Sequence, residues 1–184
     1  MRRAAFLLAM LLPVAALAAP PKKPVEKPID ALFTQLRAAQ SSEEAKSIED
    51  QILTLFQQSG SPSIDLLMVR ATAAQAAADK DTARQILEAV VNLAPKYAEG
   101  WHSLGLLQSD AGQDEDAMVS LQKAIALNPR EFQAMEQLGE MLEEYGDKPG
   151  ALKMFRAALA LDPQYEGLAR HVTALARDVE GQGI

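Results

Sequence analysis

Apolar and small residues recur with a period of 34 positions from Ile64 onward. When Ile64, Ala98 and Phe132 are aligned as first positions, six later positions agree in all three segments. They carry large side chains at the fourth position (Leu67, Trp101, Met135), small ones at the eighth (Ala71, Gly105, Gly139), alanine at the twentieth (Ala83, Ala117, Ala151), large apolar ones at the twenty-fourth (Leu87, Leu121, Phe155), small or β-branched ones at the twenty-seventh (Val90, Ala124, Ala158) and proline at the thirty-second (Pro95, Pro129, Pro163). Such agreement indicates an internal repeat.

Each repeat has the residues that a pair of antiparallel helices requires. Small side chains at the eighth and twentieth positions allow the two helices to approach closely, and the larger side chains fill the space around that contact. A central turn such as Ala111-Gly112-Gln113 separates the helices, and the proline near the end stops the second one. The pattern predicts helix–turn–helix units at 64–97, 98–131 and 132–165.

Helical periodicity continues on both sides of the three repeats. Residues 29–63 have two apolar runs, divided near Ser41-Ser42-Glu43-Glu44, where a serine can cap the second helix. This segment is predicted to be a divergent helical hairpin. Residues 166–184 are predicted to be a capping helix and tail, because four apolar residues share one helical face: Leu168, Val172, Leu175 and Val179.

The first 18 residues have the parts of a secretory signal peptide. Arg2 and Arg3 are followed by an apolar run from Ala4 to Leu17, and small residues precede the cleavage expected after Ala18. A run of about 14 apolar residues is shorter than the roughly 20 that span a bilayer. A twin-arginine route is an alternative. We expect export to the periplasm, and no transmembrane segment in the mature chain.

The next ten residues, 19–28, read APPKKPVEKP and are half proline. Five prolines in ten residues do not sustain a helix or a central strand, so the segment is predicted to be an extended linker. A proline-rich ligand for an aromatic groove is the alternative.

The repeat pattern resembles the tetratricopeptide repeat (TPR), whose unit is a 34-residue helical hairpin. The resemblance implies an all-α TPR superhelix, an α–α solenoid of about nine helices. The phrases SGSPSIDLLMVRA, APKYAEGW and DVEGQGI further resemble exported TPR proteins of the alphaproteobacterial cell envelope. The stretch from His102 to Gly105 departs from that group, in which a more basic run is expected after Trp101, and this puts a shared ligand in doubt.

Composition and charge exclude several classes of function. The 184 residues contain no Cys, which excludes disulfides, a cysteine nucleophile and a lipoprotein anchor. The net charge is −7, and −9 without Arg2 and Arg3, so no basic face for nucleic acid is expected. The only histidines are His102 and His171, and no catalytic triad, phosphate-binding loop or metal-binding motif can be built. We therefore expect no catalytic residues, no metal, no cofactor and no enzymatic activity. Trp101 is expected in the core.

In TPR proteins the concave surface is lined by fixed positions of each first helix. Carried onto this sequence, the resemblance implies a partner-binding groove that contains Met68, Thr72, Glu99, His102, Leu106, Gln133, Glu136, Glu140 and Glu143. The basic residues that clamp chaperone tails are missing from the matching places. Glu136, Glu140, Glu143 and Glu144 allow two interpretations. In one they attract a basic peptide or a divalent cation, and in the other they form only a solvated face of the helix.

These observations favour a non-enzymatic adaptor that binds a protein or peptide of the cell envelope in its groove. Two alternatives remain open at this point. One is a chaperone-like holder of an exported client, such as an apocytochrome, and the other is a structural protein that associates with itself. The sequence does not indicate the oligomeric state.

Overall fold

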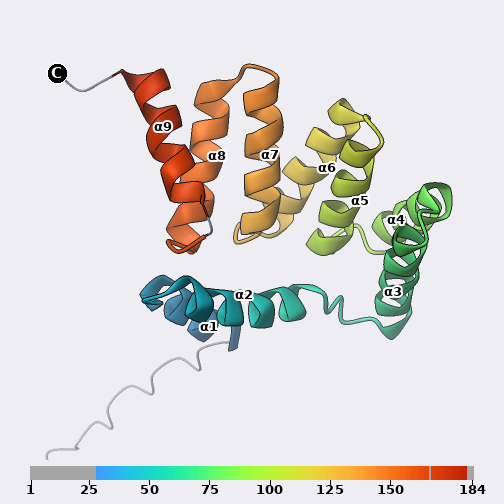
Figure 1. Cartoon of the computed structure of the whole chain (residues 1–184). Helices are drawn as coiled ribbons and strands as arrows, with labels where there is room; N and C mark the ends of the chain where they lie inside the picture. Colours follow the sequence, from blue (N-terminus) through green and yellow to red (C-terminus); the bar gives the residue numbers. More distant parts are fainter. Residues whose placement is uncertain (1–27, 166, 182–184) are drawn as a thin grey trace, which may run out of the picture.

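The computed structural model describes residues 28–165 and 167–181, and within these ranges the chain is entirely helical (Figure 1). The predicted signal peptide, 1–18, and residues 19–27 of the predicted linker lie outside the described residues. The helices are α1 (Pro28–Ala38), α2 (Ser42–Phe56), α3 (Pro62–Ala76), α4 (Lys80–Leu93), α5 (Ala98–Asp110), α6 (Asp114–Leu127), α7 (Phe132–Glu144), α8 (Lys148–Leu161) and α9 (Leu168–Glu180).

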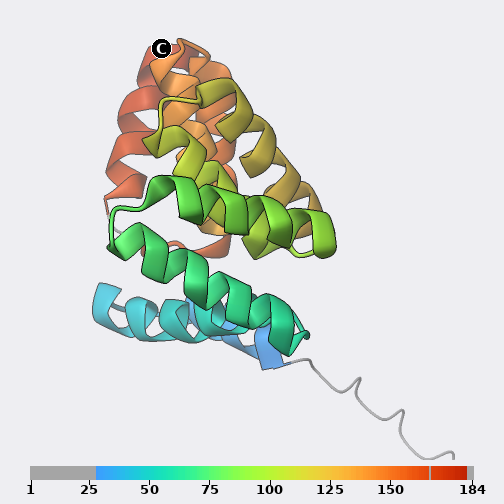
Figure 2. The same ribbon diagram turned by 90° about the vertical axis from the view of Figure 1, so that its right-hand side faces the viewer.

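Helices α3 to α8 pair as three antiparallel hairpins that occupy the three 34-residue repeats. The close approach within a hairpin depends on the small residue at the eighth position. A Cβ atom added to Gly105 would lie 3.0 Å from Leu121 Cγ, and one added to Gly139 would lie 2.5 Å from Phe155 Cε1. Successive hairpins are turned relative to one another (Figure 2). The predicted all-α solenoid is thus confirmed.

The turn inside each hairpin repeats the same backbone conformation. Gly112 and Gly146 have φ values of +70° and +84°, which glycine adopts without steric cost. Ala78 occupies the equivalent position in the first repeat with a φ of +58°. Asp79 and Asp147 then cap the second helices by accepting backbone N–H groups. Ser41 caps α2 in the same way, as predicted, through the Glu44 N–H at 3.2 Å.

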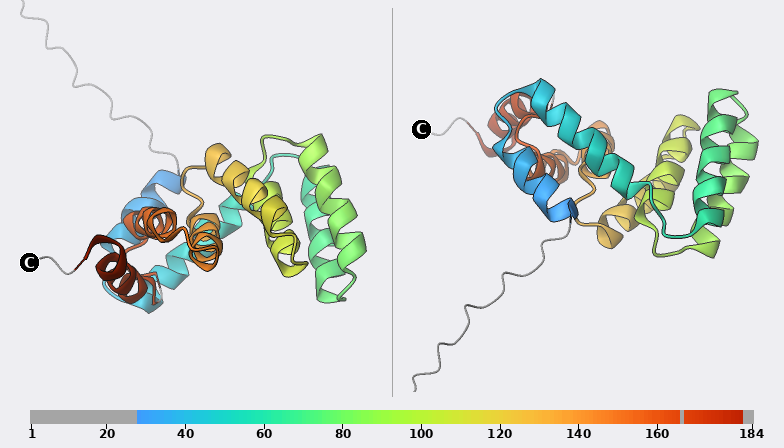
Figure 3. Two further views of the ribbon diagram at one scale, coloured as in Figure 1. Left: turned by 90° about the horizontal axis from the view of Figure 1, so that it is seen from above. Right: turned by 90° about the horizontal axis from the view of Figure 1, so that it is seen from below.

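The N-terminal hairpin α1–α2 lies along one edge of the solenoid, beneath the turns that join the repeats (Figures 1 and 3). Each of these turns holds it by at least one hydrogen bond or ion pair. The Tyr97 hydroxyl donates to Gln57 O at 2.8 Å, Arg130 Nη1 donates to Asp30 Oδ1 at 2.6 Å, and Gln164 Nε2 donates to Ala39 O at 3.4 Å. A solenoid in which every unit contacts only its neighbours would not place the hairpin there.

Aromatic packing fixes the hairpin on the third repeat. The Phe33 ring, 1% exposed, lies edge-on to Phe132 at 6.4 Å between centroids, and Phe132 contacts Tyr165 at 5.6 Å. The Arg130 guanidinium lies 4.9 Å from the centre of the Phe33 ring. One apolar cluster therefore joins α1 and α2 to α7, α8 and α9. In contrast to Phe33, the apolar side chain of Leu66 on α3 is 57% exposed.

Helix α9 covers the end of the third repeat. It buries Leu168 and Leu175 on the predicted apolar face, and two ion pairs at 2.5 Å join it to α8. These are Lys148–Asp178 and Arg156–Glu180. In the described part of the chain, every helix is too short or too polar to cross a membrane.

Candidate partner-binding surface

Three hollows meet along α7, and we call this surface the acidic groove. One of about 470 Å³ lies between α2 and α7, one of about 350 Å³ between α7 and α9, and one of about 220 Å³ among α5, α6 and α7. Glu136 lines the first two hollows, and Glu140 lines the second and third. The sequence-predicted residues in these hollows are Leu106, Gln133, Glu136, Glu140 and Glu143.

The glutamates of the acidic groove differ in their partners. Glu136 Oε2 accepts from the Tyr165 hydroxyl at 2.6 Å, and Glu143 Oε2 lies 2.6 Å from His171 Nε2. The carboxylate of Glu140, in contrast, takes part in none of the hydrogen bonds or ion pairs between side chains of the described residues. Partial burial and the charges of Glu136 and Glu143 raise the pKa of Glu140, while His171 lowers it. A cation from a partner would therefore stabilise the charged form of Glu140.

Three other predicted groove residues do not line these hollows. Thr72 is exposed on α3, where its hydroxyl donates to Met68 O at 3.1 Å. Met68 packs beside the apolar cluster of α3, α4 and α5. Glu99 is partly buried on α5. Trp101, expected in the core, is half-buried between two apolar clusters, and its indole Nε1 donates to Pro95 O at 3.1 Å.

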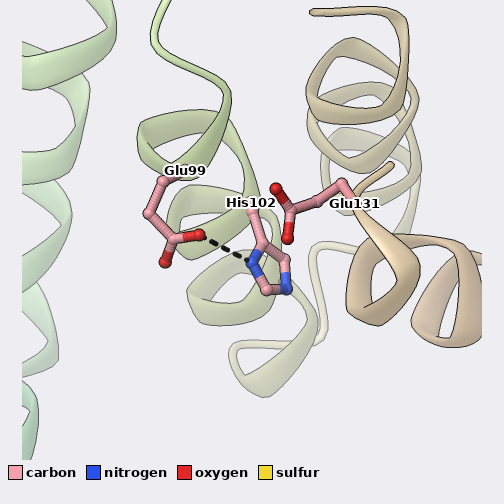
Figure 4. Close-up of side chains that lie close together, drawn as sticks. All are labelled: Glu99, His102 and Glu131. Atoms are coloured by element: carbon pink, nitrogen blue, oxygen red, sulfur yellow. Dashed lines mark hydrogen bonds and ion pairs between the residues drawn. The ribbon is translucent and has the colours of Figure 1, made fainter. Parts of the chain in front are cut away.

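His102 was predicted to face the groove, and this is wrong, because its side chain is buried with 3% exposure. The turn between α6 and α7 places the Glu131 side chain against the imidazole, so that Glu99 and Glu131 flank it (Figure 4). His102 Nδ1 lies 3.3 Å from Glu99 Oε2. Burial lowers the pKa of His102, but the Glu99 hydrogen bond and the two carboxylate charges outweigh it and raise the pKa.

Glu131 was not identified from the sequence. Its side chain is fully buried, and Asn128 Nδ2 donates to its Oε2 at 2.9 Å, while Oε1 has no hydrogen bond. Burial, assisted by the charge of Glu99, raises its pKa to about 7, against the opposing effects of His102 and Asn128. Glu99 and His102 are three residues apart on one helical face, a local signal that could have suggested a pair. No local signal marked Glu131.

A second buried acid joins α2 to the end of α8. Asp162 is fully buried, and its Oδ2 has no partner of good geometry. Burial, followed by a hydrogen bond with Asp162 and its charge, raises the pKa of Glu49 to about 7. Lys46 opposes the shift, and Asp50 adds to it. A proton on Glu49 therefore relieves the repulsion between α2 of the N-terminal hairpin and Asp162 at the end of α8.

We expect this acid pair to weaken the hairpin as pH rises. Between about pH 4.5 and 7 the folded chain holds a proton on Glu49 that the unfolded chain lacks, so stability falls over this window. Glu49→Gln should reduce this loss of unfolding free energy by about 1 kcal/mol. The effect is no larger because solvent screens a partly exposed group. Urea unfolding at pH 5.5 and 8 measures the effect.

Glu43→Gln, at an exposed site of the same helix, is the control for the pH experiment. Glu131 also has a raised pKa, so the wild-type chain loses further stability over the same window. Only the difference between variants isolates Glu49. An unchanged pH dependence in Glu49→Gln would show that the two acids are not coupled.

A family model described as tetratricopeptide repeat matches residues 98–131. A TPR repeat-containing protein of Rhizobium etli is 31% identical over 94 residues, which cover 51% of this chain and 46% of that protein. The chain thus spans about half the length of this curated relative. The match agrees with the predicted resemblance to alphaproteobacterial proteins.

Solved structures with the same fold include peptide-bound domains. PcrH, in complex with the chaperone binding region of PopD, is 25% identical with a TM-score of 0.55, over 64% of this chain and 91% of that one. The O-GlcNAc transferase of Thermobaculum terrenum is 28% identical with a TM-score of 0.55, over 62% of this chain and 22% of that one. With its three 34-residue helical hairpins and the family match at 98–131, this chain has the fold of tetratricopeptide-repeat proteins and resembles them in sequence.

Proposed function

We propose that this protein is a non-enzymatic adaptor that binds a basic segment of a partner protein in the acidic groove. The observation that supports this proposal is that the three hollows meet on α7 around Glu136 and Glu140. Groove-based peptide recognition is a common use of helical solenoids. The likeness to the transferase spans only 22% of that enzyme and does not support its activity here.

The charge of the groove indicates which partner fits. Along α7 the second hollow contains Glu136, Glu140, Glu143 and Glu144, and among the described residues His171 is the only basic side chain that lines it. Apolar contact is available beside them at Leu106 in the third hollow. A segment with two or more Lys or Arg residues and an apolar anchor complements this surface. Because much of the attraction is between exposed charges, affinity should fall with salt.

We place this adaptor in the periplasm, with the cell envelope as its setting. The proposal rests on the Arg2-Arg3 start, the apolar run after it and the small residues before Ala19. The partner is accordingly an exported protein or the exported part of a membrane protein.

Site-specific photo-cross-linking in living cells tests the adaptor function. We expect a cross-linking amino acid at Leu106, on the groove, to give one discrete adduct whose linked peptide is basic. The same amino acid at Val119, 63% exposed on α6 of the same repeat, should not. Glu136→Gln combined with Glu140→Gln should reduce the Leu106 adduct at least fivefold. Mass spectrometry of the adduct identifies the partner and the processed N-terminus, expected at Ala19.

Glu88→Gln, at an exposed carboxylate on α4, is a control for the loss of a negative charge outside the groove and should leave the adduct unchanged. An adduct from Val119 but not Leu106 would move the binding surface to the opposite face. An adduct with an acidic peptide, insensitive to the glutamate variants, would contradict the charge argument.

A chaperone-like holder is the second candidate. The PcrH structure favours it, since that protein was solved in complex with the chaperone binding region of PopD. A holder would give Leu106 adducts with the newly exported, unfolded form of a client, and these would disappear as the client folds. An adaptor would retain its adduct with the folded partner.

A further inference from the structure

The cluster of Glu99, His102 and Glu131 has the composition of a metal site. One ligand atom from each residue lies within 4.8 Å of those from the other two. Imidazole nitrogen and carboxylate oxygen are the donors that divalent transition metals accept. Glu99 and His102 are also spaced as Glu-x-x-His, which puts both side chains on one face of α5; helical bundles use this spacing for metal ligands.

Unsatisfied polar atoms concentrate at this cluster. In the described part of the chain, four buried side-chain atoms lack a hydrogen bond of good geometry, and three of them are His102 Nε2, Glu131 Oε1 and Gln137 Oε1. His102 and Glu131 are more than nine-tenths buried, so bulk water does not satisfy these atoms. Buried polar atoms without partners are costly, so a ligand that satisfied them would stabilise this cluster.

The distances suit a small divalent ion. Metal–ligand bonds of 2.0–2.2 Å in a tetrahedral site place ligand atoms about 3.3 Å apart. Glu99 Oε2 and His102 Nδ1 are separated by 3.3 Å, and an inward shift of at most about 1.5 Å would bring in the Glu131 oxygen. Coordination through Nδ1 leaves Nε2–H to donate to Gln137, whose side chain already acts on the imidazole.

The charges balance as well. A neutral imidazole with two carboxylates carries −2, which a divalent cation neutralises inside the protein. The geometry points to a structural site for a divalent transition metal of the zinc class, formed by Glu99, His102 and Glu131, with Gln137 orienting the imidazole. The ion would link the start of α7 to α5 and so stiffen the junction of the second and third repeats. The site does not depend on the proposed function, because none of its three ligand residues lines the acidic groove.

Zinc binding to the tag-free chain tests the site. After treatment with a chelator, titration calorimetry with ZnCl₂ at pH 7.5 should show one ion bound per chain, and the melting temperature should rise with zinc. His102→Gln and Glu99→Gln should each weaken binding at least tenfold, and Gln137→Leu about tenfold. Binding should also weaken at pH 5.5, because the ligands must lose their protons.

His171→Gln is the matched control, since His171 forms the other histidine–glutamate pair, on the surface with Glu143. It should leave zinc affinity unchanged. If the His102 variant fails to fold in chelator, X-ray absorption of the zinc-loaded wild-type chain decides, with one imidazole ligand expected. No zinc binding, two imidazoles or none, or a loss in His171→Gln would overturn the proposal and leave a proton-sharing cluster.

Discussion

Phe33→Ala should release the N-terminal hairpin while the three repeats remain folded. The Phe33 ring is 1% exposed and contacts Phe56 within the hairpin and Phe132 on α7. Truncating a buried phenylalanine typically costs about 3–5 kcal/mol. That is a large part of the 5–15 kcal/mol that holds a typical domain together. Because the hairpin is attached mainly through this cluster, the loss should appear as local unfolding.

Limited proteolysis with trypsin measures this release. Arg37 and Lys46 lie in α1 and α2, and cleavage there should accelerate at least tenfold in Phe33→Ala, with later sites still protected. Leu66→Ala, at a 57% exposed site on α3, is the control and should change little. Equal protection of the hairpin in both variants would mean that Phe33 does not hold it in place.

The repeats were predictable because their signal is local and recurs. At the eighth, twentieth, twenty-fourth and twenty-seventh positions the residue is buried in every repeat, as the 34-residue period required. Close approach of two helices joined by a short turn depends only on residues within one repeat, as with Gly105 and Leu121. Because the pattern recurs three times, the assignment made from one repeat can be checked against the other two.

The position of the N-terminal hairpin was not predictable in the same way. The apolar face of α1 shows that Phe33 and Leu36 must be buried, but it does not show what covers them. Their cover includes Phe132, about one hundred residues later in the chain. The residues that hold the hairpin, Arg130 and Gln164, share one repeat position in the turns, and a polar turn residue is ordinarily read as solvent-exposed.

The same reason explains the error at His102. Its repeat position is groove-facing when the turn into the next repeat leaves it uncovered, but here Glu131, the last residue of the same repeat, covers it. Glu131 follows Pro129 in a turn and has the appearance of a surface residue. Acidic residues are rarely buried without a partner, so composition alone gives no reason to expect one there.

Phe155→Ala should cost about 3–5 kcal/mol, because the ring is 1% exposed in the core that joins the hairpin to the last repeat. Its partner is Gly139, where a Cβ atom would lie 2.5 Å from Phe155 Cε1 and 2.7 Å from Cδ1. Gly139→Ala in the wild-type chain forces the ring to move, at about 1–3 kcal/mol, against roughly 1 kcal/mol gained in helix propensity. We expect the net effect to be destabilising.

The sign should reverse when the ring is absent. In the Phe155→Ala background, Gly139→Ala no longer meets the ring, so it should stabilise the chain by about 1 kcal/mol through helix propensity and partial filling of the cavity. Urea unfolding of the four chains gives the coupling energy, expected at about 1–3 kcal/mol. Ala160→Gly, at an exposed site on α8, measures the propensity effect alone. Additive effects of the two substitutions would mean that glycine at the eighth repeat position does not serve close helix packing.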